Sequence, residues 1–95
     1  DGNPTHLGTL SSAQRAVELA KLAGGTDALW QAARAASDLQ WQLELCDHLT
    51  ALGEDTRDMK AEAMTALADR EINATARNTY LWEAKKLREE LEAEA

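Results

Sequence analysis

The residues best suited to chemistry lie on one predicted helix, where Glu44 and His48 are one turn apart and Asp47 is adjacent. Side chains four positions apart share a helix face, which is the spacing at which two ligands can grip one metal ion. A catalytic zinc site needs three protein ligands, however, and the only other histidine is His6, near the N-terminus. No His-Glu-x-x-His pattern occurs. We therefore interpret the cluster as a solvated polar face, and we predict no metal or other cofactor in this chain.

Cys46 is the only cysteine, which excludes an internal disulfide and a multi-thiolate zinc site. It lies on an apolar helical stripe beside Leu45 and Leu49, where a small buried thiol is the usual role of a cysteine. Carboxylate pairs such as Asp58 and Glu62 are typical of solvated helix faces. Because no nucleophile, base and oxyanion donors converge, we predict no catalytic residue in this chain.

Two further short patterns resemble sites but suit helix ends better. Gly24-Gly25 follows a predicted helix instead of a strand, which argues against a phosphate-binding loop. Asn73-Ala74-Thr75 matches a glycosylation acceptor, a pattern that is common by chance. Asparagine is also a favoured residue immediately before a helix, so we interpret Asn73 as a cap.

The composition favours helices and disfavours several classes of partner. The apolar share of 44% consists mostly of Ala and Leu, which favour helix over strand. A net charge of −7 repels phosphate backbones and anionic lipids, so we expect no nucleic-acid or membrane partner. No apolar run approaches the roughly 20 residues needed to span a bilayer, and no secretory signal pattern is visible. We therefore expect a soluble protein.

Helical periodicity predicts a single all-α domain over residues 1–95. Residues 1–10 carry turn formers and are predicted to be an extended N-terminal segment. Ser11 and Gln14 form a capping box, Thr26 is a candidate second cap, and Gly53 is predicted to end the third helix. Short loops favour helical hairpins in a tetratricopeptide-like array. The predicted helices span about 11–23, 27–36, 38–52, 56–70 and 74–93.

Three tryptophans in 95 residues exceed what a small alanine-rich core readily holds, so we expect one or more of them to be partly exposed. Trp82 neighbours Leu81 and lies off the apolar line that runs from Ala76 to Leu91. This second apolar side either contacts another protein surface or completes the core of the chain itself. The candidate interface residues are Trp30, Trp41, Arg77, Asn78, Tyr80, Leu81 and Trp82.

The chain resembles the helical dimerisation domain of bacterial alkyl sulfatases of the metallo-β-lactamase superfamily. The resemblance rests on ordered short stretches from residue 1 to about 88, and it departs from the family at Gly53-Glu54-Asp55 and at Thr79. The stretches are Asp1-Gly2-Asn3-Pro4, Gly24-Gly25, Gln40-Trp41, Leu43-Glu44-Leu45, Asp47-His48-Leu49, Lys60-Ala61-Glu62-Ala63, Asn73-Ala74-x-Ala76-Arg77-Asn78, Tyr80-Leu81 and Ala84.

The resemblance implies a homodimerising module that also helps to wall the entrance used by an alkyl chain. It further implies a zinc-binding catalytic domain before Asp1 and a sterol-carrier-like domain after Ala95, in a cytoplasmic or periplasmic parent enzyme that hydrolyses alkyl sulfate esters. The zinc ligands of the family belong to that upstream domain. The alternative is a peptide-binding adaptor of tetratricopeptide type. Trp41–Leu67 is similar to one such repeat in its order of a helix ending in Leu-Gly, an acidic turn and a helix of small residues, although the full repeat signature is absent.

Overall fold

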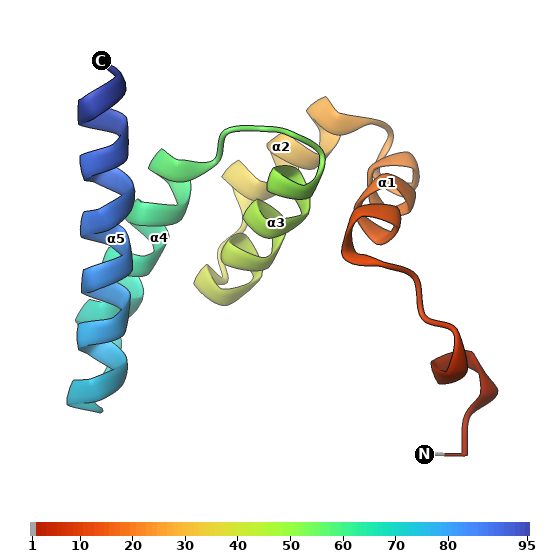
Figure 1. Ribbon diagram of the computed structural model, residues 1–95, viewed down its shortest axis with the longest axis horizontal. Helices are drawn as coiled ribbons and strands as arrows, with labels where there is room; N and C mark the ends of the chain where they lie inside the picture. The colour runs from red at the N-terminus through yellow and green to blue at the C-terminus, as the bar shows by residue number, and fades with distance from the viewer. Residues whose placement is uncertain (1) are drawn as a thin grey trace.

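The computed structural model describes residues 2–95, which form five α-helices, one short 3-10 helix and no strand (Figure 1). The predicted all-α class with about five helices is thereby confirmed. The elements are η1 (Pro4–Leu7), α1 (Ser12–Ala23), α2 (Thr26–Ala35), α3 (Leu39–Ala51), α4 (Arg57–Arg70) and α5 (Ala74–Glu94).

The sequence predicted an extended N-terminal segment, but Pro4–Leu7 forms a 3-10 turn, so the segment is not wholly extended. The Asn3 side chain caps this turn by accepting a hydrogen bond of 3.2 Å from the backbone N–H of Thr5. Pro4 also suits the first helical position, since its φ is fixed and it needs no hydrogen-bond acceptor. The segment from Gly2 to Arg15 is exposed throughout, and Asp1 lies outside the described residues.

The first two helices meet at a tight glycine turn. The Ser11–Gln14 capping box is present, with both reciprocal hydrogen bonds formed at 3.0 and 3.1 Å. Gly24 has a φ of +107°, a conformation that favours glycine, and its N–H caps the last carbonyls of α1. The expected cap at Thr26 is wrong: the second positive-φ glycine, Gly25, turns the chain so sharply that α2 begins at Thr26 itself.

The helices pack mainly on their neighbours in sequence. The first three helices contact one another, α3 contacts α4, and α5 contacts α4 alone. In Figure 1 α4 and α5 lie side by side and run in opposite directions, with α5 at the edge of the molecule farthest from the N-terminus. The radius of gyration is 15.2 Å, against about 12 Å for a compact domain of this length. The molecule is therefore an open array.

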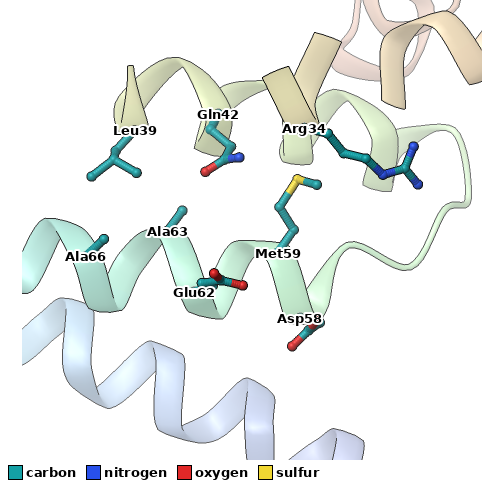
Figure 2. Close-up of a pocket in the computed structure, with 8 residues that line it drawn as sticks. All are labelled: Arg34, Leu39, Gln42, Asp58, Met59, Glu62, Ala63 and Ala66. Carbon is teal, nitrogen blue, oxygen red and sulfur yellow. The ribbon is translucent and has the colours of Figure 1, made fainter. Parts of the chain in front are cut away.

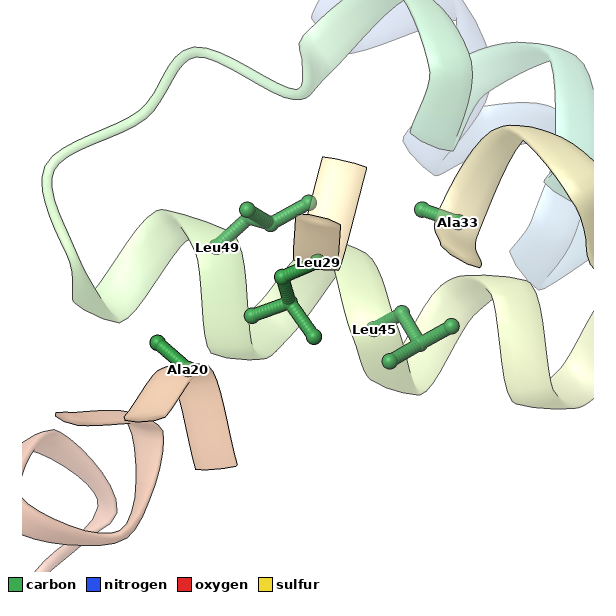
Figure 3. Packing of buried hydrophobic residues seen from close by; sticks show 5 residues of the cluster. All are labelled: Ala20, Leu29, Ala33, Leu45 and Leu49. Atoms are coloured by element: carbon green, nitrogen blue, oxygen red, sulfur yellow. The ribbon is translucent and has the colours of Figure 1, made fainter. Parts of the chain in front are cut away.

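The first core cluster joins α1, α2 and α3. Figure 3 shows Leu29 of α2 between Ala20 of α1 and the α3 side chains Leu45 and Leu49, with Ala33 beside them. All five side chains are buried, so this part of α3 follows the predicted apolar stripe. Burying a leucine side chain contributes about 1.5–3 kcal/mol, which makes this cluster the main anchor for the N-terminal half of the array.

The second core cluster joins α4 to α5 through Ala61, Met64 and Ala84. Leu43, Tyr80 and Leu87 pack against it. Helical periodicity alone predicts one inward face of α4, formed by Met59, Ala63, Ala66 and Leu67. Ala63 is buried and the other three are half-buried, but Ala61, Met64 and Ala68 are buried too. The reason is that α4 lies between α3 and α5 and is covered on two sides.

Candidate protein interface

The seven candidate interface residues fall into two groups by exposure. Trp30 and Tyr80 are half-buried within the chain. Trp41 and Trp82 are 46% and 61% exposed, which confirms the expectation that the indoles exceed the capacity of the core. The remaining exposed candidates are Arg77, Asn78 and Leu81.

Trp30 holds the array together from inside. Its ring packs against the first core cluster, and its indole Nε1 donates a hydrogen bond of 2.7 Å to Oε1 of Glu54. The Arg34 guanidinium lies 5.1 Å from the ring centroid, within cation–π range. These contacts link α2 to the loop after α3, so most of the indole serves the fold of a single chain.

Tyr80 and Trp41 lie apart from the other candidates. Tyr80 packs against the second core cluster, on the side of α5 that faces α4. Trp41 lies in the first turn of α3, where Asp38 caps the helix by accepting a hydrogen bond of 2.9 Å from the backbone N–H of Trp41. The structure therefore does not join all seven candidates into one surface.

Four candidates do share one surface on α5. Arg77 and Leu81, and likewise Asn78 and Trp82, are one turn apart, and all four are exposed. The same side of the helix continues with charged residues toward its C-terminal end. We call this surface the outer face of α5, and it consists of Arg77, Asn78, Leu81, Trp82, Lys85, Arg88, Glu89 and Glu92.

A shallow groove of about 510 Å³ borders the outer face. Thr65 forms its α4 wall, and Leu81, Ala84 and Lys85 contribute to its α5 wall together with Arg88, Glu89 and Glu92. The sequence carries no signal of this groove, because Thr65 lies on another helix. The groove lies next to the exposed Leu81, and an apolar side chain of another protein can enter it.

A second groove, of about 350 Å³, lies between α3 and α4. Figure 2 shows Leu39 and Gln42 of α3 facing Ala63 and Ala66 of α4, with Met59 closing one end. Arg34, Asp58 and Glu62 also line it, so charges of both signs surround an apolar floor. Because Gln42 Nε2 already donates a hydrogen bond of 2.8 Å to the Ala33 carbonyl, part of the polar lining is satisfied internally.

The residues that the sequence singled out as candidates for chemistry make structural contacts instead. Glu44 accepts a hydrogen bond of 2.9 Å from Gln40, and Asp47 forms an ion pair of 2.9 Å with Lys60 of α4. The Cys46 thiol is buried, and this burial raises its pKa. Asn73 caps α5 by accepting a hydrogen bond of 2.9 Å from the backbone N–H of Ala76. Within residues 2–95, no three metal-binding side chains gather closely enough to hold an ion.

The carboxylate of Asp55, just before α4, has a strongly lowered pKa. Hydrogen bonds from Arg57 hold the pKa of Asp55 at about 2, and those from the same guanidinium lower the pKa of Glu94. Helical spacing alone places Arg57 on a face of α4 that is available to water, whereas in the structure it ties the first turn of α4 to the last turn of α5. Thirty-seven positions separate Arg57 from Glu94, so no local spacing rule signals this pair.

The i, i+4 spacing on α5 predicts three ion pairs, Lys85 with Glu89, Lys86 with Glu90 and Arg88 with Glu92, of which the structure forms only the first. Lys85 does lie 3.9 Å from Glu89, as expected. Lys86 instead lies 3.6 Å from Glu83, and Arg88 reaches Asp58 of α4 at 3.3 Å. The basic-first i, i+4 order is a weak arrangement, so a contact on another turn or helix readily replaces it.

None of the helices in the described part of the chain combines the length and apolar character needed to cross a membrane.

Comparison with known proteins agrees with this helical architecture. The profile of the alkyl sulfatase dimerisation family matches residues 1–90. An (R)-specific secondary-alkylsulfatase of Pseudomonas sp. is 33% identical over 93% of this chain and 14% of its own length. A linear primary-alkylsulfatase of Pseudomonas sp. (strain ATCC 19151) is 33% identical over 98% of this chain and 19% of its own length. No solved structure was found to match.

The chain thus spans less than a fifth of the length of either relative. The match nevertheless extends over nearly all of the five-helix array, including the outer face of α5 from Arg77 to Glu89. The protein belongs to the alkyl sulfatase dimerisation family.

Proposed function

We propose that this chain is the dimerisation module of a larger alkyl sulfatase and that it pairs two subunits through the outer face of α5. The family match and the two alkylsulfatase relatives support this role. The observation that carries it is the exposure of Leu81 and Trp82 on the helix that packs on one neighbour only. Apolar side chains of this size, exposed together beside a polar rim, mark protein contact surfaces.

The total surface also favours a partner. The accessible area is 6494 Å², whereas a compact monomer of 10.4 kDa exposes about 5,400 Å². The excess is of the order that one subunit contributes to a standard protein interface, about 800 Å². Subunit pairing would therefore bury an area similar to the excess that this open array exposes.

In this proposal the chemistry belongs to a catalytic domain of the same polypeptide. That domain hydrolyses alkyl sulfate esters and depends on zinc. The residues of this chain do not fit a zinc site: His48 lies on α3, His6 lies in the N-terminal segment, and no third ligand joins either of them within residues 2–95. Accordingly, no step of sulfate-ester hydrolysis is assigned to this chain.

Sedimentation velocity over a concentration series tests the pairing. We expect the wild-type chain to form dimers at micromolar concentration and the variant Leu81→Ala/Trp82→Ala to remain monomeric and helical. Ile72→Ala is the matched control, because Ile72 is 94% exposed but lies in the loop before α5. A wild-type chain that stays monomeric at high micromolar concentration would show that the module does not pair on its own.

The peptide-binding adaptor hypothesis is not favoured. A groove lined by outward asparagine and arginine would favour it, and Arg77 and Asn78 are the only such cluster in the sequence. These two residues lie on the outer face of α5 and not among the residues that line the groove between α3 and α4. The lining of that groove combines one arginine with two carboxylates, so it has no single charge preference for a peptide.

A further inference from the structure

The charges on the outer face of α5 are distributed unequally along the helix. Lys85 pairs with Glu89 in the middle of the face, and Arg88 pairs with Asp58 of α4. Arg77 near the N-terminal end and Glu92 near the C-terminal end have no ion-pair partner within residues 2–95. The face therefore has one unpaired positive end and one unpaired negative end.

Arg77 and Glu92 cannot pair within one chain. At ~1.5 Å per residue they are separated by about 22 Å along the axis of α5. In a two-fold pair of antiparallel α5 helices, a residue near one end of the helix approaches a residue near the opposite end of the other copy. The symmetry repeats this contact with the two copies exchanged. With the axis near Ala84 and Lys85, Arg77 of each copy reaches Glu92 of the other copy. Both unpaired charges are then neutralised by the same symmetry operation.

The apolar residues fit the same arrangement. About this axis, Trp82 of one copy is level with Leu87 of the other copy, so it meets the middle of the α4–α5 groove. Ala84 and the methyl group of Thr65 form the less polar part of that groove, and Lys85, Arg88 and Glu89 line the rest of it at this level. Lys85 lies beside the groove, where its ammonium group can approach the face of the incoming indole. Trp82 is thus the projecting group and the groove is its receptor.

We infer that α5 pairs antiparallel with α5 of a second copy, with Arg77–Glu92 ion pairs at both ends and Trp82 seated in the opposite α4–α5 groove. This inference rests on the proposed dimerisation and adds its surface and orientation. A parallel pair is disfavoured because it places Arg77 against Arg77 and Glu92 against Glu92. Like charges in direct opposition suppress the wrong arrangement, so the end charges select the orientation.

Charge reversal tests the orientation by sedimentation equilibrium at low salt, where exposed ion pairs act most strongly. In the antiparallel dimer, Arg77→Glu and Glu92→Arg each replace two attractions with two repulsions. We expect each to raise the dimer dissociation constant about tenfold. The double variant Arg77→Glu/Glu92→Arg restores both pairs with reversed signs and should dimerise like the wild type. Arg70→Glu on α4 is the control with the same change in net charge as Arg77→Glu.

Disulfide trapping gives a second readout of orientation. Lys85→Cys lies near the two-fold axis, so we expect oxidation to link two copies. Two Asn78→Cys sites would be about 20 Å apart along the antiparallel pair, far beyond the ~7 Å Cα limit for a disulfide, so no link is expected. In a parallel pair both variants would link. Cys46 is buried and does not compete in the folded chain.

The outcomes separate this inference from the proposed function. A wild-type dimer that is insensitive to Arg77→Glu, or that links through Asn78→Cys, overturns the antiparallel arrangement and leaves dimerisation standing. A wild-type chain that is monomeric at every concentration overturns both. Weakening by each single reversal, recovery in the double variant and selective linking through Lys85→Cys support both.

Discussion

The indole Nε1 of Trp30 donates a hydrogen bond of 2.7 Å to Oε1 of Glu54, joining α2 to the loop between α3 and α4. The backbones of α2 and α4 do not approach each other closely, although Met59 of α4 packs against the first core cluster. This bond therefore ties the first core cluster to the loop that sets the direction of α4. Glu54 thus has a local structural role in this chain.

Removing the acceptor should loosen this tie. We expect Glu54→Ala to lower the free energy of unfolding by about 1–2 kcal/mol, because the half-buried indole N–H loses a charged partner. Glu54→Gln keeps an oxygen acceptor at the same position and should cost less than about 1 kcal/mol. Urea unfolding followed by circular dichroism measures both, at a protein concentration low enough to keep the chain monomeric. Equal losses for the two variants would assign the effect to something other than this hydrogen bond.

Leu45 is one of three fully buried leucines of the first core cluster, with Leu29 and Leu49. We expect Leu45→Ala to lower the free energy of unfolding by about 2–5 kcal/mol, through lost burial and the cavity left behind. Leu22→Ala makes the same chemical change at a site that is 86% exposed, and it should alter the stability by no more than about 0.5 kcal/mol. A loss at Leu22 as large as that at Leu45 would contradict the assigned core.

Some parts of this fold were predictable from sequence because their causes are local. The stripe containing Leu45, Cys46 and Leu49 repeats at helical spacing, so its pattern can be recognised in the sequence although α3 contacts α1, α2 and α4. The burial of Ala61 and Ala68 was not predicted, because α4 is covered on two sides and its alanines form no single stripe.

The same reasoning explains the partial prediction of the interface. The surplus of indoles is a property of composition, and it correctly indicated exposed tryptophan. Which candidates share a face depends on how the helices pack. Tyr80 and Trp82 are two positions apart on one helix, so they point in widely different directions, and only the position of α4 decides which of them is covered.

The Asp55–Arg57 contact makes stability depend on pH at the acid end. Arg57 holds the pKa of Asp55 at about 2, below its ordinary value of 3.8, so the folded state favours the charged carboxylate. The stabilisation from this pair is therefore complete above about pH 4 and is lost as the pH falls from about 4 to about 2. Arg57→Gln should return the Asp55 pKa toward its ordinary value and flatten this acid dependence.

Side-chain carboxyl chemical shifts recorded during an NMR pH titration measure the pKa of Asp55 directly. Lys60→Gln is the matched control, because Lys60 pairs with Asp47 on α3 and not with Asp55. An Asp55 titration midpoint that is the same in the wild type and in Arg57→Gln would show that the contact does not persist in solution.

Cys46 provides a reporter of opening around α3. Its thiol is fully buried, and burial raises its pKa, so both access and thiolate content are low in the folded chain. We expect a thiol reagent such as dithionitrobenzoate to modify Cys46 only through unfolding, at a rate that rises with added urea. Leu45→Ala should accelerate the modification in proportion to its loss of stability, whereas Leu22→Ala should leave the rate unchanged. Rapid modification of the native wild-type chain would instead place Cys46 at an accessible surface and contradict its burial.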